Sequence, residues 1–267
     1  MITDSEFNRI VVYMKQRFGI DLSKKRVLVG GRLENYLVRN GYANYDEYMK
    51  KVEANPNGTE ATDLVNVLTT NHTYFMRESE HFDFMTHVAL PWARSVAMRD
   101  RDLRIWCGAS STGEEPYTLA MILLDFFGVE HNHWDTKVLA TDISERVLKH
   151  AMHGVYLKED VDPLPQRWKQ KYFKPVDAEQ YAVKDDLKKE VLFRQFNLMN
   201  SFPFRRKFHI VFLRNVMIYF EDSTKYQLIQ KVYDFMEPGG YLFIGTTEGL
   251  DRKKTSFQYV QPSIYRK

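Results

Sequence analysis

The sequence predicts an α/β fold in which a mostly parallel, twisted sheet has helices on both faces and follows an all-helical N-terminal domain. The first observation is that short apolar runs alternate with amphipathic stretches from residue 103 onward. The clearest runs are LRIWC, TKVLAT, FHIVFL and YLFIGT. Strands that alternate with helices form a parallel sheet covered on both sides. The second observation is that residues 1 to about 80 carry apolar residues at helical spacing.

The first predicted helix follows a capping residue at positions 3–5 and ends at Gly19, because glycine is a common helix stop. Its apolar stripe consists of Phe7, Ile10, Val11, Met14 and Phe18. Two further stripes, at 45–52 and 61–68, predict two more helices in the same part of the chain.

The segment at 22–42, LSKKRVLVGGRLENYLVRNGY, holds five cations and one acid. If it is helical, Lys25, Arg32 and Arg39 share a face, because steps of seven residues drift by only ~20° per heptad. The pair Gly30–Gly31 is the place where such a helix could break. The basic face is either simply solvated or a docking surface for an acidic partner.

The α/β part is expected over residues 81–267 and the helical domain over 1–80. In the α/β part, an amphipathic helix follows Glu221, and PGG at 238–240 is expected to turn the chain into the next strand. The alternation stalls at about 155–195, a charged stretch with three prolines. We expect a small inserted subdomain there, with a helix near 165–173 and two or three short antiparallel strands.

Composition excludes several classes of protein. The formal charge of +3 is too small to suggest nucleic-acid binding, and no apolar run approaches the ~18–20 residues of a membrane span. The N-terminus lacks the pattern of a signal peptide. A single cysteine rules out an internal disulfide and suits a reducing cytoplasm, so we expect a cytoplasmic protein.

The glycine turn after the first strand has the glycine spacing of a phosphate loop but the wrong charge. Gly108 and Gly113 stand five apart, yet Glu114 and Glu115 follow where that motif has lysine. Two carboxylates repel a phosphate. The next strand ends at Asp142, where nucleotide-binding sheets place an acid for ribose hydroxyls. A ligand with a ribose and positive charge but no phosphate fits both, and S-adenosylmethionine is such a ligand.

Other interpretations of the turn stay open at this point. Any α/β fold can place a glycine after its first strand. A nicotinamide dehydrogenase is disfavoured, because the G-x-G-x-x-G spacing is absent and a pyrophosphate would lie beside the two glutamates. Polar residues recur in LTTNHTYFMRESEHF at 68–82, which is either a capped linker or part of a site. Arg214 and Asn215 are unusual at the end of the apolar strand in FLRNVMIYF.

Six motifs follow one another along the chain: TNHTYFMRE, GASSTGEEPYTLA, LATDIS, FNLM, FLRNVMIYF and EPGGYLFIGTTE. In this order and spacing they closely resemble the CheR family of chemoreceptor glutamate O-methyltransferases, which depend on S-adenosylmethionine. The resemblance implies a methyltransferase-type sheet that ends in an antiparallel hairpin of YLFIGTTE with QYVQPSIYR. It also implies a helical N-terminal domain, a small inserted β-subdomain and S-adenosylhomocysteine as the product.

The resemblance also implies the site residues. Arg77 would hold the substrate carboxylate, Tyr219 would lie near the transferred methyl group, and Asp142 would contact the ribose. The implied cofactor-binding residues are Asn71, Thr73, Arg77, Glu115, Asp142, Asn197, Leu198, Arg214 and Asn215. Cys107 is interpreted as a buried strand residue, because methyl transfer needs no covalent enzyme intermediate.

A glutamate substrate explains why the sequence shows no obvious base or metal cluster. The ordinary pKa of a glutamate side chain is ~4.3, so the nucleophile is already ionised at neutral pH. We therefore expect no metal. A methyltransferase with another acceptor remains the alternative function, and a module that only senses the cofactor is disfavoured by the presence of Arg77 and Tyr219.

The expected partner is the cytoplasmic helical bundle of chemoreceptors, which presents glutamates. Lys25, Arg32 and Arg39 would then form the docking face. The inserted stretch KYFKPVDAEQYAV has no glycine, unlike family members that bind a receptor's C-terminal pentapeptide, so we do not expect tail binding. We expect a monomer.

Overall fold

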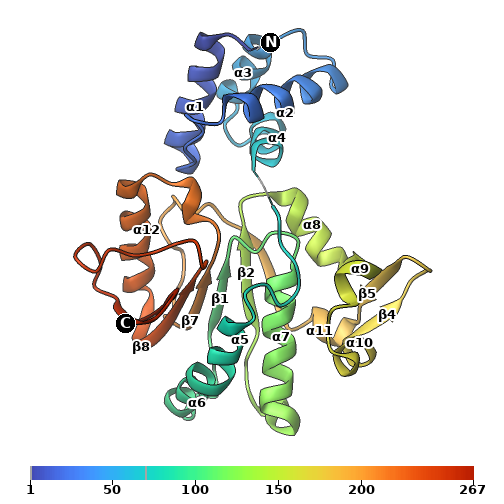
Figure 1. The fold of residues 1–267 in the computed structure, drawn as a ribbon, viewed down its shortest axis with the longest axis vertical. Coiled ribbons are helices and arrows are strands. Elements are labelled where there is room, and N and C mark those ends of the chain that lie inside the picture. The colour runs from blue at the N-terminus through green and yellow to red at the C-terminus, as the bar shows by residue number, and fades with distance from the viewer. Residues whose placement is uncertain (1, 70) are drawn as a thin grey trace.

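A computed structural model describes residues 2–69 and 71–267 (Figure 1). Within residues 2–69 the chain forms α1 (Asp4–Phe18), α2 (Arg26–Arg39), α3 (Tyr45–Ala54) and α4 (Thr59–Leu68). These helices enclose a core of their own, which includes Ile10, Leu33, Tyr48 and Leu64. The predicted all-helical N-terminal part is confirmed.

Helix α2 runs without interruption through the double glycine. Gly30 is buried, and a side chain there would meet Ile2, whereas Gly31 faces open space. Helix α1 begins with a capping box between Thr3 and Glu6 and ends at Gly19, whose φ of 73° lies in the left-handed region that glycine adopts without strain.

The second part of the chain forms a seven-stranded sheet with the order β6-β2-β1-β7-β8-β10-β9. The first five strands in this order pair in parallel, and β10 pairs antiparallel with β8 and β9. This confirms the predicted mostly parallel sheet. The strands are β1 (Ile105–Gly108), β2 (Val138–Asp142), β6 (Val191–Gln195), β7 (Phe208–Leu213), β8 (Met236–Ile244), β9 (Gln258–Gln261) and β10 (Ile264–Arg266).

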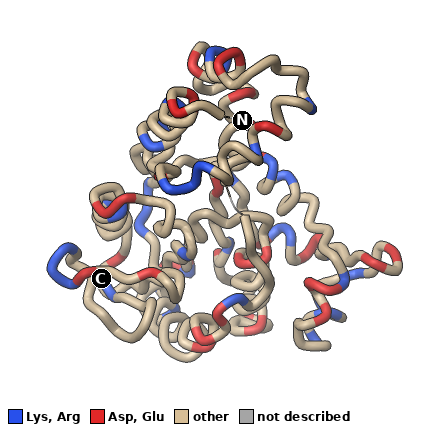
Figure 2. Tube along the Cα trace, turned by 45° about the horizontal axis from the view of Figure 1, so that its top comes forward, with Lys and Arg blue, Asp and Glu red and all other residues tan. Residues whose placement is uncertain are grey.

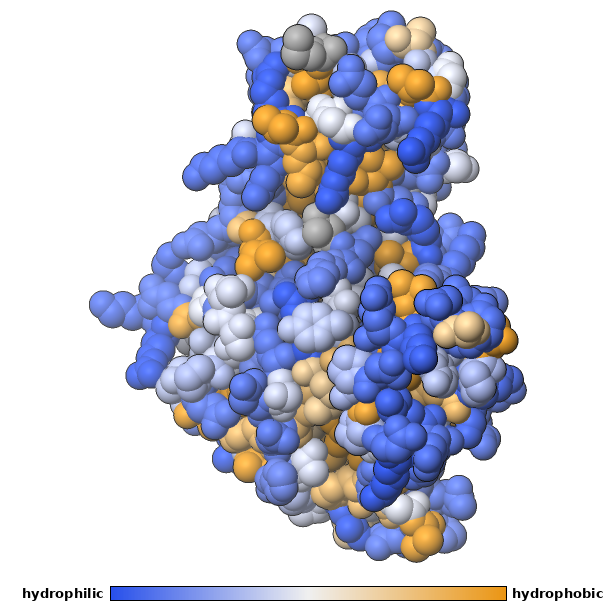
Figure 3. Space-filling model, turned by 45° about the vertical axis from the view of Figure 1, so that its right-hand side comes forward, coloured by the Kyte–Doolittle hydropathy of each residue, from blue (hydrophilic) through white to orange (hydrophobic). Residues whose placement is uncertain are grey.

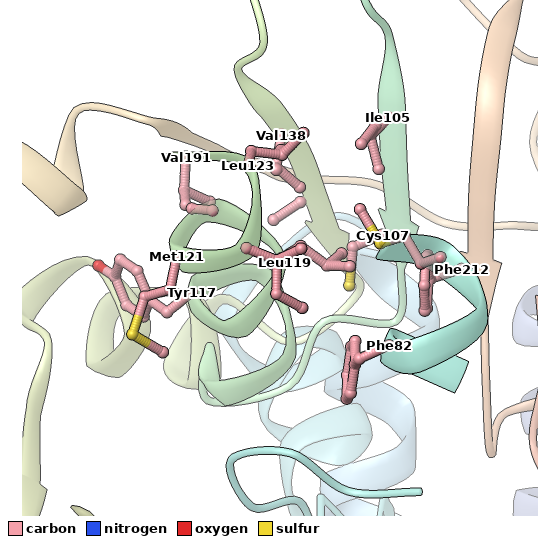
Figure 4. Close-up of a cluster of buried hydrophobic side chains, with 14 of the residues drawn as sticks. Phe82, Ile105, Cys107, Tyr117, Leu119, Met121, Leu123, Val138, Val191 and Phe212 are labelled. Atoms are coloured by element: carbon pink, nitrogen blue, oxygen red, sulfur yellow. The ribbon is translucent and has the colours of Figure 1, made fainter. Parts of the chain in front are cut away.

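Helices cover both faces of this sheet (Figure 1). They are α5 (Glu80–Phe84), a π-helix η1 (Met85–Ala89), α6 (Leu90–Ala97), α7 (Glu114–Phe127), α8 (Glu145–His153) and α12 (Asp222–Asp234), with 3₁₀ turns η2 (Gly128–His133) and η3 (Met217–Tyr219). Leu119 of α7 points toward Cys107 of β1, and Phe82 stacks on Phe212 with ring centroids 5.9 Å apart (Figure 4). Cys107 is fully buried, as predicted.

A small antiparallel sheet, β3-β5-β4, projects beside α7 and α8 (Figure 1). One anchor to the main domain is Asp125 of α7, which accepts hydrogen bonds from Trp168, Lys171 and Tyr172. The elements are β3 (Val155–Leu157), α9 (Lys158–Val161), α10 (Gln166–Tyr172), β4 (Phe173–Pro175), β5 (Gln180–Val183) and α11 (Asp185–Lys188).

The antiparallel pairing expected between YLFIGTTE and QYVQPSIYR is confirmed, and it runs through the IYR residues of the second segment. The strand that pairs with β8 is β10, and the QYVQ segment (β9) pairs with the far side of β10 at the sheet edge. A left-handed residue, Ser263 with φ 63°, lies in the tight turn that folds β10 back on β9. The PGG sequence also lies within β8, at a register shift, rather than before the strand.

Candidate active site

One cavity lies at the carboxyl ends of β1, β2 and β7 and extends to the end of α1. Open parallel sheets bind their ligands at this edge. The residues expected from the sequence that line the cavity are Asn71, Thr73, Arg77, Glu115, Asp142, Asn197, Leu198, Arg214, Asn215 and Tyr219. The structure therefore brings together ten residues that are spread over about 150 positions of the chain. Lys25, Arg32 and Arg39 do not line it.

The glycine turn between β1 and α7 is tightly packed. A Cβ on Gly113 would lie 2.8 Å from both the Cβ of Ala151 and the hydroxyl of Tyr156, and the φ of Gly113 is 102°. Ala109 and Ser111 in the same turn also have positive φ, which costs energy for residues with a side chain. The turn is therefore strained, and three of its residues, Ala109, Ser110 and Ser111, line the cavity.

Asp142 holds this turn in place. One carboxylate oxygen accepts the backbone N–H of Ser111 and the other accepts that of Ser144, both at 2.9 Å. The residue is 6% exposed, and burial raises the pKa of its carboxyl group. A carboxylate has about four lone-pair sites, so Asp142 can accept a further hydrogen bond from a ligand hydroxyl.

The two glutamates of the turn face different surroundings. Glu115 lines the cavity, where it accepts hydrogen bonds from Arg214 at 2.7 Å and from the thiol of Cys107 at 3.1 Å. Glu114 is buried, accepts from the hydroxyl of Thr112 at 2.7 Å, and does not line the cavity. Burial raises the pKa of Glu114 to about 7. Of these two glutamates, only Glu115 can present its carboxylate to a ligand in the cavity.

Arg214 connects three chain segments under the cavity. Its side chain is 1% exposed and lies between Glu115 and Glu78, which is 3.1 Å away. It also donates to the carbonyl of Arg77. The guanidinium of Arg77 itself donates to the carbonyl of His72 at 2.8 Å and is partly exposed, so it can reach a second molecule.

The end of α1 forms one wall of the cavity, which sequence reasoning missed. Phe18 and Ile20 line it, and Ile20 bridges to Phe220. The backbone N–H of Asp21 donates to the carbonyl of Tyr219 at 2.8 Å. The side-chain amide of Asn197 donates to the carbonyl of Arg17 at 2.9 Å. The sequence predicted only that the first helix ends at Gly19.

Two acidic residues near the cavity, Glu78 and Glu248, also escaped the sequence analysis. Glu78 accepts from the side-chain amide of Asn215 at 3.3 Å and from the backbone of Thr246 at 3.1 Å. Among the residues that the structure describes, the carboxylate of Glu248 accepts hydrogen bonds only from backbone N–H groups. Glu78 lies in the motif TNHTYFMRE and Glu248 in EPGGYLFIGTTE. The order of residues in a motif does not show which atoms a carboxylate contacts.

Among residues 2–69 and 71–267, no three His, Cys, Asp or Glu side chains are arranged to hold a metal ion. In the same part of the chain, no helix has both the length and the apolar character needed to cross a membrane.

Comparison with known proteins supplies the family. The family model for the all-alpha domain of CheR methyltransferase matches residues 5–69, and that for the SAM binding domain of CheR methyltransferase matches residues 71–266. The chain belongs to the CheR methyltransferase family. As a CheR methyltransferase it carries an S-adenosylmethionine-binding domain in the segment that contains the sheet and most of the cavity wall.

Curated relatives match the CheR chain over its full length. A chemotaxis protein methyltransferase of Borreliella burgdorferi is 39% identical over 272 residues, which cover 100% of this chain and 95% of the relative. The chemotaxis protein methyltransferase of Escherichia coli K12 is 33% identical and is covered to 90%, with 99% of this chain matched. Chemotaxis protein methyltransferase Cher2 of Pseudomonas putida is 32% identical, with 97% of this chain and 95% of the relative matched.

Proposed function

We propose that this CheR methyltransferase transfers the methyl group of S-adenosylmethionine to glutamate side chains of chemoreceptors, as a transferase in chemotaxis signal transduction. The products are glutamate 5-O-methyl esters and S-adenosylhomocysteine. The observation that carries the proposal is one cavity that combines the carboxylates of Glu115 and Asp142 with Arg77 and Tyr219. The family and the names of the relatives support the acceptor.

The residues present fit the cofactor. Two side-chain atoms in cavity-lining residues, the hydroxyl of Ser110 and Nε of Arg214, are buried without a hydrogen-bond partner among the described residues. Such groups are costly unless a ligand or water satisfies them. In the proposal, Asp142 accepts from the ribose hydroxyls and Glu115 from the ammonium group. Asn197 and Leu198 flank the adenine, and Asn71, Thr73, Arg214 and Asn215 complete the wall.

The chain's own task in this reaction is alignment. When bound, the cofactor supplies an electrophilic methyl group on a sulfonium. Arg77, partly exposed beside the cavity, pairs with the substrate carboxylate, and Tyr219 orients it. Because a glutamate is ionised at neutral pH, no residue has to remove a proton and no metal is needed. Holding two reactants in line can lower the barrier by about 7–11 kcal/mol.

We propose that α2 docks the cytoplasmic helical bundle of the receptor through Lys25, Arg32 and Arg39. The start of α2 supports this proposal: Lys24, Lys25 and Arg26 lie there, without an acidic residue in the first turn. Cations at a helix N-terminus oppose the helix dipole, so they favour an acidic partner. Elsewhere charges of both signs are interspersed (Figure 2).

Arg32 has a second role in this proposal. Its guanidinium donates to the carbonyls of Val67 at 3.3 Å and Thr69 at 2.9 Å. Thr69 lines the cavity. Arg32 therefore connects the docking helix to the chain that enters the active site.

We further propose that the enzyme acts as a cytoplasmic monomer and does not bind a receptor tail pentapeptide. Strand β4, one edge of the small sheet, ends at Pro175, which has no N–H to offer an added strand. The connection to β5 at 176–179 contains no glycine. Binding of an isolated tail pentapeptide at micromolar concentration would contradict this.

The test of function is methyl transfer from labelled cofactor to receptor fragments, followed by treatment with base. Carboxyl methyl esters release methanol in base, whereas N-methyl groups stay bound. Base-labile label that disappears when the receptor glutamates are replaced is the expected result. Base-stable label, or label only on another acceptor, would overturn the assignment in favour of a different methyltransferase.

A further inference from the structure

The segment from Arg214 to Tyr219 follows β7 and carries four of the cavity-lining residues, Arg214, Asn215, Val216 and Tyr219. It needs support from elsewhere in the chain, because Asn215 has a φ of 56°. A left-handed residue with a side chain persists only where its surroundings hold it. The segment also contacts the N-terminal domain through the carbonyl of Tyr219. Its shape therefore decides where Tyr219 lies relative to both domains.

The carboxylate of Glu248 supplies this support. One of its oxygens accepts the backbone N–H of Met217 at 2.7 Å and of Ile218 at 3.2 Å. The other accepts the backbone N–H of Asn215 at 2.9 Å and of Gly245 at 2.7 Å. Four backbone donors from the ends of β7 and β8 thus converge on one side chain, and they use all four lone-pair sites of the carboxylate.

Gly245 shows how closely the two strand ends approach each other. A Cβ at this position would lie 2.4 Å from the side-chain amide nitrogen of Asn215. Glu78, next to Arg77, contacts the same place by accepting from the side chain of Asn215 and from Thr246. Glu248 therefore holds the segment from the turn that follows β8, while Glu78 connects it to the chain beside Arg77.

We propose that Glu248 is a positioning residue for methyl transfer. It does not line the cavity, and it acts by fixing the backbone from Asn215 to Ile218, which sets the place of Tyr219. This inference rests on the proposed function of Tyr219. It assigns a role to a carboxylate that neither binds the cofactor nor touches the substrate.

Two substitutions of Glu248 and one control test whether it positions the backbone. Glu248→Gln keeps the shape of the side chain but exchanges one oxygen for an NH₂ group, so two acceptor contacts are lost and a donor faces two backbone donors. Glu248→Asp keeps the charge but is one methylene shorter. Thr247→Val is the matched control, because Thr247 is the exposed neighbour of Glu248 in the same turn.

The experiment measures kcat, receptor KM and cofactor affinity for these variants. For Glu248→Gln we expect kcat to fall by about 10²-fold, the scale expected for a misplacement of ~1 Å, with cofactor affinity near that of the wild type. Thr247→Val should behave as wild type. If Glu248 acts through Tyr219, the double variant Glu248→Gln with Tyr219→Phe should be little slower than Tyr219→Phe alone. The role would be overturned if Glu248→Gln had the kcat of the wild type, or if the losses of kcat in the two single variants added fully in the double variant.

Amide hydrogen exchange gives a readout that does not depend on the reaction. In the wild type, the amides of Asn215, Met217 and Ile218 should exchange slowly, and in Glu248→Gln they should exchange faster while those of α7 stay protected. If Glu248→Gln does not fold, the same measurements apply to Glu248→Asp. Fast exchange of these amides in the wild type would refute the proposal. Protected amides in an enzyme that fails to methylate receptors would refute only the proposed function.

Discussion

Glu114 and Glu115 are neighbours in sequence, yet one is buried under the glycine turn and the other faces the cavity. Burial raises the pKa of Glu114 from its ordinary value of 4.5 to about 7. The folded protein therefore keeps this proton up to about pH 7, whereas the unfolded chain loses it near pH 4.5. Unfolding releases a proton in this window, so the stability contributed by Glu114 is lost as the pH rises.

Glu114→Gln should therefore gain stability relative to the wild type as the pH rises from 5 to 8. The gain has an upper limit of about 3 kcal/mol, since one pKa unit corresponds to ~1.36 kcal/mol. Denaturant unfolding at both pH values measures it. Glu145→Gln, an exposed residue in the first turn of α8, should show no such gain. An equal difference between Glu114→Gln and wild type at both pH values would contradict the prediction.

Arg77 is the second residue whose role is testable on its own. We expect Arg77→Ala to lower kcat/KM for the receptor. The loss should correspond to about 1.5–3 kcal/mol of transition-state stabilisation, the usual contribution of a hydrogen bond to a charged group. Arg77→Lys should not restore activity, because one ammonium group cannot both donate to His72 and hold a carboxylate in a bidentate fork. Wild-type turnover in the lysine variant would remove Arg77 from this role.

At the scale of residues, the sequence identified ten residues that the structure places around one cavity, because they lie in motifs with a recognisable order. It could not identify Phe18 and Ile20, since apolar residues at a helix end look the same whether they cover a core or a ligand. Nor could it identify Glu248, whose carboxylate accepts hydrogen bonds from four backbone N–H groups. Every residue except proline has a backbone N–H group, so residue types do not show which of these groups donate to a carboxylate.

At the scale of elements, α1 forms a wall of the cavity because it ends at Phe18, with Gly19 as its cap. A Cβ on Gly19 would lie 2.5 Å from the sulfur of Met199 and 3.0 Å from the methyl group of Thr224. The end of α1 therefore fits against Met199 and against Thr224 of α12 with no spare room.

Gly19→Ala should destabilise the protein by about 1–2 kcal/mol, the cost of a left-handed residue with a side chain, and should also weaken cofactor binding. Gly41→Ala is the matched control, because Gly41 has a similar φ of 71° but open space around it. It should lose stability without losing cofactor affinity. Thermal unfolding and calorimetry with S-adenosylmethionine separate the two effects. Equal cofactor affinity in both variants would show that α1 does not shape the site.

Other elements show where sequence patterns stop being informative. Helix α2 continues through Gly30–Gly31, because Gly30 packs closely against Ile2 and tertiary contacts outweigh its low helix propensity. The alternation of strands and helices predicted the parallel sheet correctly. The pairing of β10 between β8 and β9 could not be predicted, because strand order at an antiparallel edge depends on the turn between them and not on periodicity.

At the scale of the molecule, the smaller N-terminal part sits on the carboxyl edge of the sheet (Figure 1) and forms the narrower, upper part of the space-filling view (Figure 3). If α2 docks the receptor, Lys25→Glu with Arg39→Glu should lower kcat/KM for the receptor and leave cofactor affinity unchanged. The wild-type rate should also fall with salt, because exposed charges are screened within ~8–10 Å at physiological ionic strength. Arg32 is left intact, since its guanidinium holds the carbonyls of Val67 and Thr69.

The control for this pair is Arg99→Glu with Lys207→Glu, which makes the same change in net charge on exposed residues near the opposite edge of the sheet. It should have little effect. Equal losses in both double variants would point to net charge rather than to docking. If Lys25→Glu with Arg39→Glu leaves kcat/KM for the receptor unchanged, and the wild-type rate does not change with salt, then α2 is an ordinary solvated helix.

The distance along the chain between the walls of the cavity has a consequence for biosynthesis. Ile20 meets Phe220, and Glu248 holds the segment before Phe220, so the walls join residues 200 positions apart. Contacts of such high sequence separation form late in folding, after a large loop-closure entropy has been overcome. A nascent chain on the ribosome can complete its N-terminal helices early, yet it cannot assemble this pocket until almost its last residues have emerged. Unfinished chains and fragments truncated before Glu248 should therefore neither capture the cofactor nor compete for it.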